Sequence, residues 1–184
     1  MLTNYDTLQT KSIDTEPTES VHQKLLFQAP EADRLSWYRS SIREAFAHKE
    51  SIFLALPTLH DIELFSEHIS KGIETYTIVL SSDQNKKTFI ENWNNAMTTD
   101  HPVLIIGTPP YAIIPRADIK TIIIEHERAG AYKSIISPGY DFRIFLELLA
   151  YERKQKIIFS DTLTRVETIE RLQQHELGEI MPLV

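Results

Sequence analysis

Charged side chains directly follow an apolar run in residues 120–133, KTIIIEHERAGAYK. Three isoleucines predict a buried strand, and they are followed without a break by Glu125, His126, Glu127 and Arg128. Acids and a histidine at the end of such a strand could transfer protons or bind a cation. This stretch is therefore the first candidate for an active site.

Length and composition indicate one globular domain and exclude several classes of protein. The chain has 184 residues, of which 42% are hydrophobic and 24% are charged, as in ordinary globular proteins. No apolar run is long enough to span a membrane and no signal-peptide pattern is present, so we expect a cytoplasmic protein with no membrane partner. The absence of cysteine excludes disulfides, thiolate catalysis and cysteine-bound zinc.

The net charge of −7 restricts the ways in which the chain could bind nucleic acid. Acidic residues outnumber basic ones by 26 to 19, whereas a protein that holds duplex DNA alone displays a basic face. Any contact with DNA is therefore expected to be local, weak or shared with other domains.

The hydrophobic pattern alternates between continuous apolar runs and stretches with helical spacing. The apolar runs predict strands at residues 24–28, 51–57, 75–82, 102–108, 121–125 and 156–161. The helical spacing predicts helices at residues 35–48, 59–71, 85–97, 141–153 and 165–175. Such alternation indicates an α/β fold, with a doubly wound, mostly parallel sheet of about six to seven strands and helices on both faces.

We expect a single domain at residues 21–184, preceded by a flexible arm at residues 1–20, which are rich in Thr, Ser and acids. In a doubly wound sheet, ligands bind beyond the carboxyl ends of the strands. The functional edge should therefore be formed by the loops that follow Gln28, Leu56, Ser81, Gly107, Glu125 and Ser160.

Four short motifs occur in order along the second half of the chain. They are Gly107-Thr108, Tyr132-Lys133, Tyr140-x-x-Arg143 and Ser160-x-Thr162. In this order and spacing they resemble the first RecA-like domain of superfamily-two DNA helicases, in particular the primosomal replication-restart helicases (primosomal protein N′, PriA), over residues 25–172. The resemblance implies a RecA-like, P-loop NTPase-type fold and, in an active member, ATP and Mg²⁺ as cofactors.

The resemblance places a phosphate-binding loop, G-x-x-x-x-G-K-[ST], at residues 28–35, where this chain reads QAPEADRL. The stretch has no glycine, and Glu31 and Asp33 put negative charge where phosphate would lie. Arg34 replaces the Lys that contacts the phosphates, and Leu35 replaces the hydroxyl that holds Mg²⁺. We expect such a motif to have lost its affinity for nucleotides. The residues of this degenerate motif are Pro30, Glu31, Asp33, Arg34 and Leu35.

The resemblance also places the family's Asp-Glu-Glu-His box at residues 125–128. Glu125 matches the Asp and could still bind a cation, and Glu127 keeps the second Glu. His126 replaces the Glu that positions the attacking water, and Arg128 replaces the His. A neutral histidine could act as a base, but without a phosphate cradle there is nothing for water to attack. We therefore expect a degenerate site with no ATP hydrolysis and no bound cofactor.

Other residues at matching positions are candidates for contact with DNA. Thr108 could donate to a phosphate, although the arginine of the family's Gly-Thr-Arg-Ser loop is absent. Tyr140 and Arg143 could stack on a base or contact the backbone, or Tyr140 and Phe142 could instead pack the next helix onto the sheet. The DNA-binding candidates are Thr108, Tyr111, Lys133, Tyr140 and Arg143.

Two further groups of polar residues carry weaker signals. His60, Glu63 and Glu67 share a face of the helix expected at residues 59–71 and could hold a metal, but such a cluster is more typical of a solvated surface. Ser160-Asp161 lacks the G-x-S-x-G turn of a hydrolase. We therefore expect neither a metal site nor a serine nucleophile.

Three hypotheses about function remain open from the sequence. In the first, the chain is a RecA-like domain without ATPase chemistry that has a structural or regulatory role in DNA replication or repair, holding other domains, a protein partner, or forked or single-stranded DNA. In the second, it is one half of an active DNA-dependent ATPase and helicase, and its second RecA-like domain lies elsewhere. In the third, it is a protein-interaction module, which the charge of −7 and the acidic arm favour.

Overall fold

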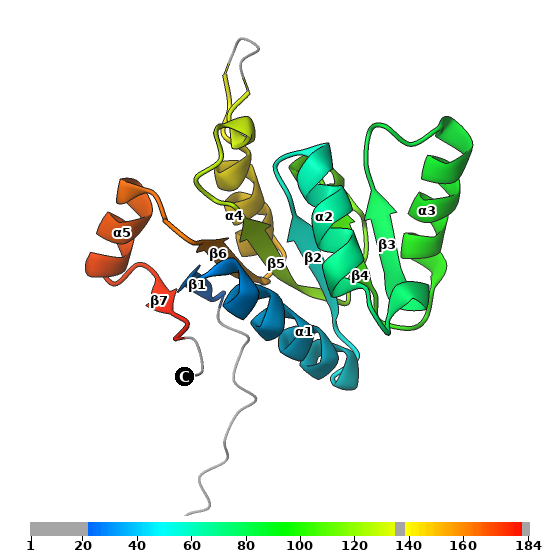
Figure 1. Ribbon diagram of the computed structural model, residues 1–184, viewed down its shortest axis with the longest axis horizontal. Helices are drawn as coiled ribbons and strands as arrows, with labels where there is room; N and C mark the ends of the chain where they lie inside the picture. Colours follow the sequence, from blue (N-terminus) through cyan, green and yellow to red (C-terminus); the bar gives the residue numbers. More distant parts are fainter. Residues whose placement is uncertain (1–21, 135–138, 182–184) are drawn as a thin grey trace, which may run out of the picture.

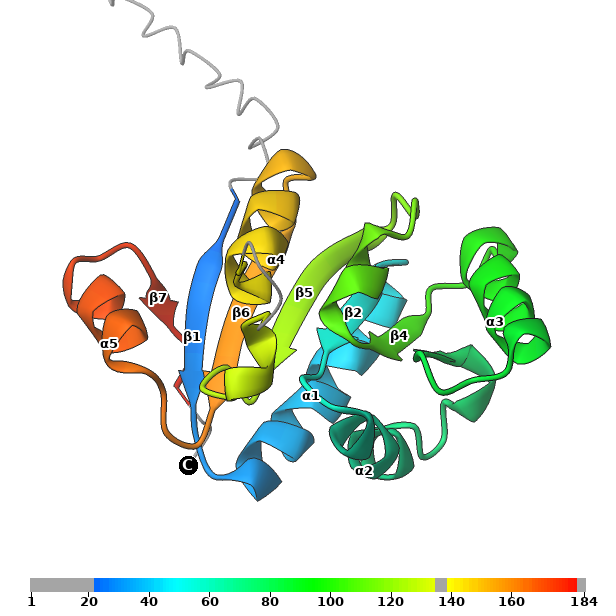
Figure 2. The same cartoon turned by 90° about the horizontal axis from the view of Figure 1, so that it is seen from above.

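The described part of this computed structural model, residues 22–134 and 139–181, forms one seven-stranded sheet. The strand order is β3-β4-β2-β5-β6-β1-β7, and every neighbouring pair is parallel. Helices cover both faces of the sheet (Figures 1 and 2). The structure therefore confirms the doubly wound α/β fold. The arm expected at residues 1–20 lies outside the described residues.

All strands but the last coincide with apolar runs in the sequence. They are β1 (Lys24–Gln28), β2 (Ser51–Ala55), β3 (Thr77–Leu80), β4 (Leu104–Gly107), β5 (Ile119–Glu125), β6 (Lys156–Asp161) and β7 (Gly178–Glu179). Every residue of β2 and β4 is buried, as expected for inner strands of a parallel sheet covered on both faces. Strand β7 has two exposed residues and no apolar pattern, so the sequence does not predict it.

All the expected helices are present. They are α1 (Glu31–Ala47), α2 (Leu59–Ile69), α3 (Lys86–Thr98), α4 (Phe142–Glu152) and α5 (Val166–Gln173), with short 3₁₀ helices η1 (Glu74–Tyr76), η2 (Pro109–Ile113) and η3 (Gly130–Tyr132). The expected start of the first helix at Leu35 was wrong, because α1 begins four residues earlier with acids in its first turn, where the helix dipole favours them. None of the described helices is long and apolar enough to cross a membrane.

Two hydrophobic cores lie on opposite faces of the sheet. On one face, α1 and α2 contribute buried residues that include Ile42 and Phe65. On the other face, α3 and α4 contribute residues that include Ala96 and Leu146, and Leu172 of α5 packs against the same core. The helices thereby fix the orientation of the loops at both ends of the strands.

The carboxyl ends of β1 and β6 form a topological switch point. The two strands are neighbours, with Gln28 paired to Asp161. The chain leaves β1 through α1 towards β2, whereas it leaves β6 through α5 towards β7 on the opposite side. In open α/β sheets, ligands bind at such a point. The side chains at this edge therefore define the candidate site.

Gly107 ends β4 at a position that has no room for a side chain. A Cβ atom added there would lie 2.6 Å from the backbone oxygen of Leu80 in the neighbouring strand β3. Real Cβ atoms do not approach a backbone oxygen this closely, so the glycine of the Gly107-Thr108 motif is required by strand packing.

Candidate functional site

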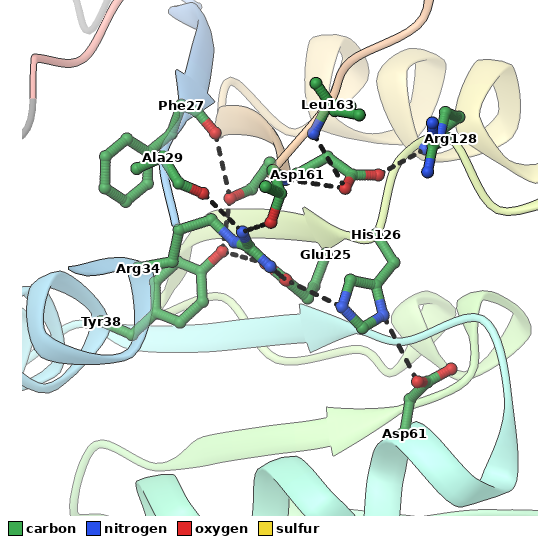
Figure 3. A network of polar contacts seen from close by, with 12 residues as sticks. Phe27, Ala29, Arg34, Tyr38, Asp61, Glu125, His126, Arg128, Asp161 and Leu163 are labelled. Carbon is green, nitrogen blue, oxygen red and sulfur yellow. Dashed lines mark hydrogen bonds and ion pairs between the residues drawn. The ribbon is translucent and has the colours of Figure 1, made fainter. Parts of the chain in front are cut away.

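Arg34 and Glu125 form an ion pair at the carboxyl edge of the sheet, and both side chains are 0% exposed (Figure 3). Arg34 lies near the start of α1, and Glu125 is the last residue of β5. Arg34 Nε donates to Glu125 Oε1 at 3.0 Å and to Oε2 at 3.3 Å, and Nη2 also donates to Oε1. The pair thus joins the two positions at which the helicase resemblance expects phosphate and Mg²⁺ binding.

The remaining nitrogen of the Arg34 guanidinium also has acceptors within the chain. Nη1 donates to the backbone oxygen of Ala29 at 2.6 Å and to Thr162 Oγ1 at 2.7 Å. Burial by itself lowers the pKa of Arg34, but the hydrogen bond and charge of Glu125 outweigh burial and raise it. Arg34 is therefore a charged group whose nitrogens are all engaged by the protein itself.

Tyr38 is a third buried group on the same carboxylate. Its hydroxyl donates to Glu125 Oε2, and its oxygen lies 2.5 Å from Ser160 Oγ. Tyr38 follows Arg34 by four residues, so both side chains project from one face of α1. Burial, and then the charge of Glu125, raise the pKa of Tyr38 well above its usual range. The phenol is therefore neutral, and both oxygens of Glu125 accept hydrogen bonds from α1.

The connection between β1 and α1 consists of two residues, Ala29 and Pro30. The stretch expected to correspond to a phosphate loop is therefore mostly helix. Its first turn exposes Glu31 and Asp33, and Pro30 has no N–H to donate. A nucleoside triphosphate with Mg²⁺ does not fit these residues, because the acids repel phosphate and the only cation of the motif is already paired.

His126 connects the end of β5 to the start of α2. Its Nδ1 lies 3.3 Å from Asp61 Oδ1 and its Nε2 lies 3.4 Å from Glu125 Oε1. Its φ of 52° lies in the left-handed region, which histidine adopts more readily than most residues. Both ring nitrogens of His126 therefore face carboxylates of the protein.

Glu127 is fully buried and caps α5. Its Oε1 accepts from the backbone N–H of Arg165 at 2.6 Å, and its Oε2 accepts from Arg165 Nε at 3.0 Å and from Thr168 Oγ1 at 3.2 Å. A carboxylate at the start of a helix is favoured by the helix dipole. The second acid of the 125–128 box therefore holds α5 in place.

Asp161 joins the loops that follow β5 and β6. Its Oδ1 accepts from the backbone N–H of Thr162 at 2.7 Å, and its Oδ2 accepts from that of Arg128 at 3.0 Å. The side chain of Arg128 is exposed, so this residue contributes its backbone to the network. Asp161 was not among the predicted site residues, although it directly follows Ser160 of the motif.

Arg143, one of the predicted DNA contacts, is 2% exposed. Its guanidinium binds both carboxylate oxygens of Asp141 at 2.8 and 2.7 Å and donates to the backbone oxygen of Glu127 at 2.6 Å. Burial raises the pKa of Asp141, but the hydrogen bonds and charge of Arg143 outweigh burial and lower it. Arg143 therefore fixes the loop after β5 to the start of α4.

Two of the predicted DNA contacts, Lys133 and Tyr140, are exposed and lie close together. Lys133 forms a backbone bridge with Asp141, next to Tyr140 in the sequence. Tyr140 is 54% exposed and its ring meets Phe142 edge to face, with centroids 5.0 Å apart. Phe142 packs on the core, as expected if it packs the next helix onto the sheet. Tyr140, in contrast, is largely exposed to solvent.

The other two DNA candidates lie at the start of η2 and within it. Thr108 precedes η2, and its backbone oxygen accepts from the N–H of Tyr111 at 3.1 Å. Tyr111 packs on Phe89 with ring centroids 5.3 Å apart and is partly buried. These two residues therefore lie apart from Lys133 and Tyr140, beyond the end of β4.

Across the described ranges, no group of three or more His, Asp or Glu side chains is placed to hold a metal ion. His60, Glu63 and Glu67 are exposed on α2, while Asp61 turns to His126. The sequence did not identify Tyr38, Asp61 or Asp161 as site residues. Only the four-residue spacing from Arg34 to Tyr38 was a local signal for any of them.

No protein-family model matches the chain. The sequence is 21% identical over 136 residues to the replication restart protein PriA of Buchnera aphidicola subsp. Schizaphis graminum, and the match covers 74% of this chain and 19% of PriA. The chain therefore spans about a fifth of the length of this curated relative.

Two solved structures share the fold. The C-terminal domain of S. cerevisiae Dbp5 bound to Gle1 and IP6 has a TM-score of 0.60 and 12% identity, over 87% of this chain and 90% of that chain. The C-terminal domain of the DEAD-box protein Dbp5 has a TM-score of 0.55 and 14% identity, over 88% and 91%. Identities this low show the fold alone. The shared fold and the sequence match to PriA together show that the chain resembles a helicase RecA-like domain.

Proposed function

We propose that this chain is a helicase-type RecA-like domain that does not hydrolyse ATP. Its role is structural or regulatory, in DNA replication or repair, and consists of holding a protein partner, neighbouring domains or forked DNA. The relation to helicase domains supports the assignment to this class of protein. The sequence likeness to PriA supports replication restart as the context.

One observation carries the proposed loss of ATPase activity. Arg34 and Glu125, which would have to contact phosphate and Mg²⁺, are 0% exposed and bind each other. To release either group for a nucleotide would leave the other charge buried and unpaired, which costs about 3–5 kcal/mol. The two-residue connection before α1 offers no backbone N–H cradle in compensation.

Calorimetric titration of the whole chain with ATP and Mg²⁺ tests the loss of nucleotide binding. We expect no binding up to millimolar nucleotide, and no phosphate release with or without forked DNA. Micromolar affinity, or phosphate release stimulated by DNA, would contradict the proposal. It would favour the alternative in which the chain is one half of an active helicase.

The exposed pair of Lys133 and Tyr140 supports a local contact with DNA. A lysine can neutralise one phosphate and a tyrosine can stack on one base, and stacking alone contributes about 1–3 kcal/mol. Weak binding of forked DNA at low salt is therefore expected, and Tyr140→Ala should weaken it by about tenfold or more. Lys71 is an exposed lysine just after α2, and Lys71→Ala is the matched control for Lys133→Ala.

Titration of labelled forked DNA at several salt concentrations provides the measurement. Weaker binding by Lys133→Ala with a smaller salt dependence, and unchanged binding by Lys71→Ala, would support the contact. No binding by the wild-type chain at low salt would instead favour a pure protein-interaction module.

A further inference from the structure

Helix α4 carries apolar side chains on its outer face as well as on the face that packs on the sheet. Leu146 and Ala150 are 0% exposed and face the core. On the opposite side of the helix, Ile144, Leu148 and Tyr151 are 60%, 60% and 61% exposed. Their spacing of four and three residues aligns them in one stripe along the helix. Tyr151 meets the ring of His22 edge to face, with centroids 5.6 Å apart, but most of the stripe is exposed. Exposed apolar patches often mark interaction sites.

A groove runs beside this stripe. It has a volume of about 480 Å³, and the three exposed residues of α4 form its apolar wall. Its charged side consists of Lys24, Glu147, Arg171 and Glu176. The groove therefore combines apolar surface with a short row of charges, which is the composition of a helix-binding site.

The cations in the groove are already paired. Lys24 Nζ lies 2.7 Å from Glu147 Oε1, and Arg171 donates to both oxygens of Glu147 at 2.6 and 3.0 Å. Arg171 also donates to Glu176 at 3.0 Å. Burial raises the pKa of Glu147, but Arg171 and Lys24 outweigh burial and lower it, so the carboxylate is charged. Glu176 is the most exposed charged group of the groove, with 50% of its side chain exposed.

The two helices beside the groove add acidic charge. In α4 and α5, both of which the structure describes in full, the two bases are Arg143 and Arg171. Arg143 is paired to Asp141 and Arg171 to two glutamates, whereas Glu152 and Glu170 are exposed. The exposed charged residues within α4 and α5 are therefore acidic, as is the chain as a whole, with its net charge of −7.

We propose that this groove binds an amphipathic helix of a partner protein whose apolar stripe is flanked by Lys or Arg. The apolar stripe packs on Ile144, Leu148 and Tyr151, and a basic side chain meets Glu176. A second copy of this chain is a poorer fit, because two chains of charge −7 repel each other. The inference goes beyond the proposed function, because it holds whether or not a nucleotide binds near Arg34.

A synthetic peptide of about 18 residues, with Leu on one face and Lys on the other, is the probe. Its fluorescence anisotropy is measured against the whole chain, beside a peptide in which Glu replaces every Lys. We expect the Lys peptide to bind at least about tenfold more tightly than the Glu peptide. Leu148→Asp should weaken its binding by about tenfold or more, whereas Leu163→Asp, which alters an exposed leucine outside the groove, should leave it unchanged.

A second variant, Glu176→Lys, tests the charge without touching the apolar stripe. This variant should bind the Lys peptide more weakly and the Glu peptide more tightly than the wild type does. Equal affinities of wild type and Leu148→Asp would overturn the proposal. So would self-association of the wild-type chain that Leu148→Asp abolishes, because a second copy would then cover the groove. Displacement of the probe by a synthetic peptide of residues 1–20 would likewise assign the groove to the chain's own N-terminal residues.

Discussion

Arg34 and Glu125 are separated by 91 residues in the sequence, yet they form one fully buried ion pair. The pair fastens α1 to the end of β5, and the bond from Arg34 to Thr162 adds the loop after β6. Each charge is tolerated in the interior only because the other is present. The site is therefore as much a part of the folded core as the apolar residues beneath it.

Removal of the cation should destabilise the fold strongly. Arg34→Met leaves Glu125 buried without its partner, and we expect the free energy of unfolding to fall by about 3–5 kcal/mol. Urea unfolding followed by tryptophan fluorescence measures the change. Arg39→Met is the control. Within the described residues Arg39 donates only to the backbone oxygen of His68, so its removal should cost about 1 kcal/mol. Equal losses for the two variants would contradict a special role of the pair.

Restoring the residue types of a phosphate loop should not restore nucleotide binding. In the double variant Arg34→Lys, Leu35→Thr, the connection from β1 to α1 still consists of two residues without a glycine. We expect calorimetry with ATP and Mg²⁺ to show no affinity gained over the wild type. Micromolar binding by the double variant would mean that side-chain identity, and not loop length, limits the site.

Stability should fall at alkaline pH because of Tyr38. Burial raises the pKa of this phenol in the folded state, so its contribution is complete below the unfolded value of about 10 and declines as pH rises above that value. Tyr38→Phe should lower stability at pH 7 by about 1 kcal/mol and flatten the decline above pH 10. Chemical unfolding between pH 7 and 11 measures both effects. A decline of unchanged steepness in the variant would contradict the assignment.

Stability should also fall at acid pH because of Glu147. Arg171 and Lys24 hold the pKa of this carboxyl below its ordinary value of 4.5, despite burial. Its contribution is therefore complete above pH 4.5 and is lost as pH falls from there through the lowered value. Glu147→Gln should show a shallower loss of stability over this range than the wild type. Thermal unfolding between pH 3 and 7 provides the comparison, and identical acid profiles would count against the ion-pair network.

Gly107→Ala should destabilise the fold by disturbing the contact between β4 and β3. The added methyl group would lie 2.6 Å from the Leu80 backbone oxygen, and relief of such a clash typically costs about 1–3 kcal/mol. Gly130→Ala is the matched control, because a Cβ atom there meets nothing within 4 Å. Thermal unfolding of both variants gives the comparison. A tolerated Gly107→Ala would mean that β3 and β4 can separate without loss of packing.

The sequence predicts the fold well where hydrophobic pattern alone determines structure. Strand β5 is a run of isoleucines, and its end at Glu125 follows directly from the pattern. Strand β7 could not be predicted, because it consists of two exposed residues held by backbone bonds to β1. The predicted start of α1 at Leu35 was also wrong, because acids in a first turn are a less distinctive signal than an apolar period.

The sequence locates the site but not its internal pairing. Arg34 and Glu125 were each identified by their position in a motif, but no local pattern links two residues 91 positions apart. Glu127 and Arg143 were predicted as site residues, and both are largely buried in contacts with the chain itself. Whether a polar residue at a strand end faces solvent or the interior depends on neighbouring loops, which the sequence pattern does not reveal.

The two-residue connection before α1 also has an evolutionary consequence. The stretch that corresponds to a phosphate loop has its full eight residues, 28–35, but its last five lie in α1. Under the proposed function, a descendant of this protein could regain a phosphate cradle only if the first turn of α1 unwound, which would also displace Arg34 from Glu125. Each intermediate would carry an unpaired buried charge, so selection for a stable fold would oppose the return.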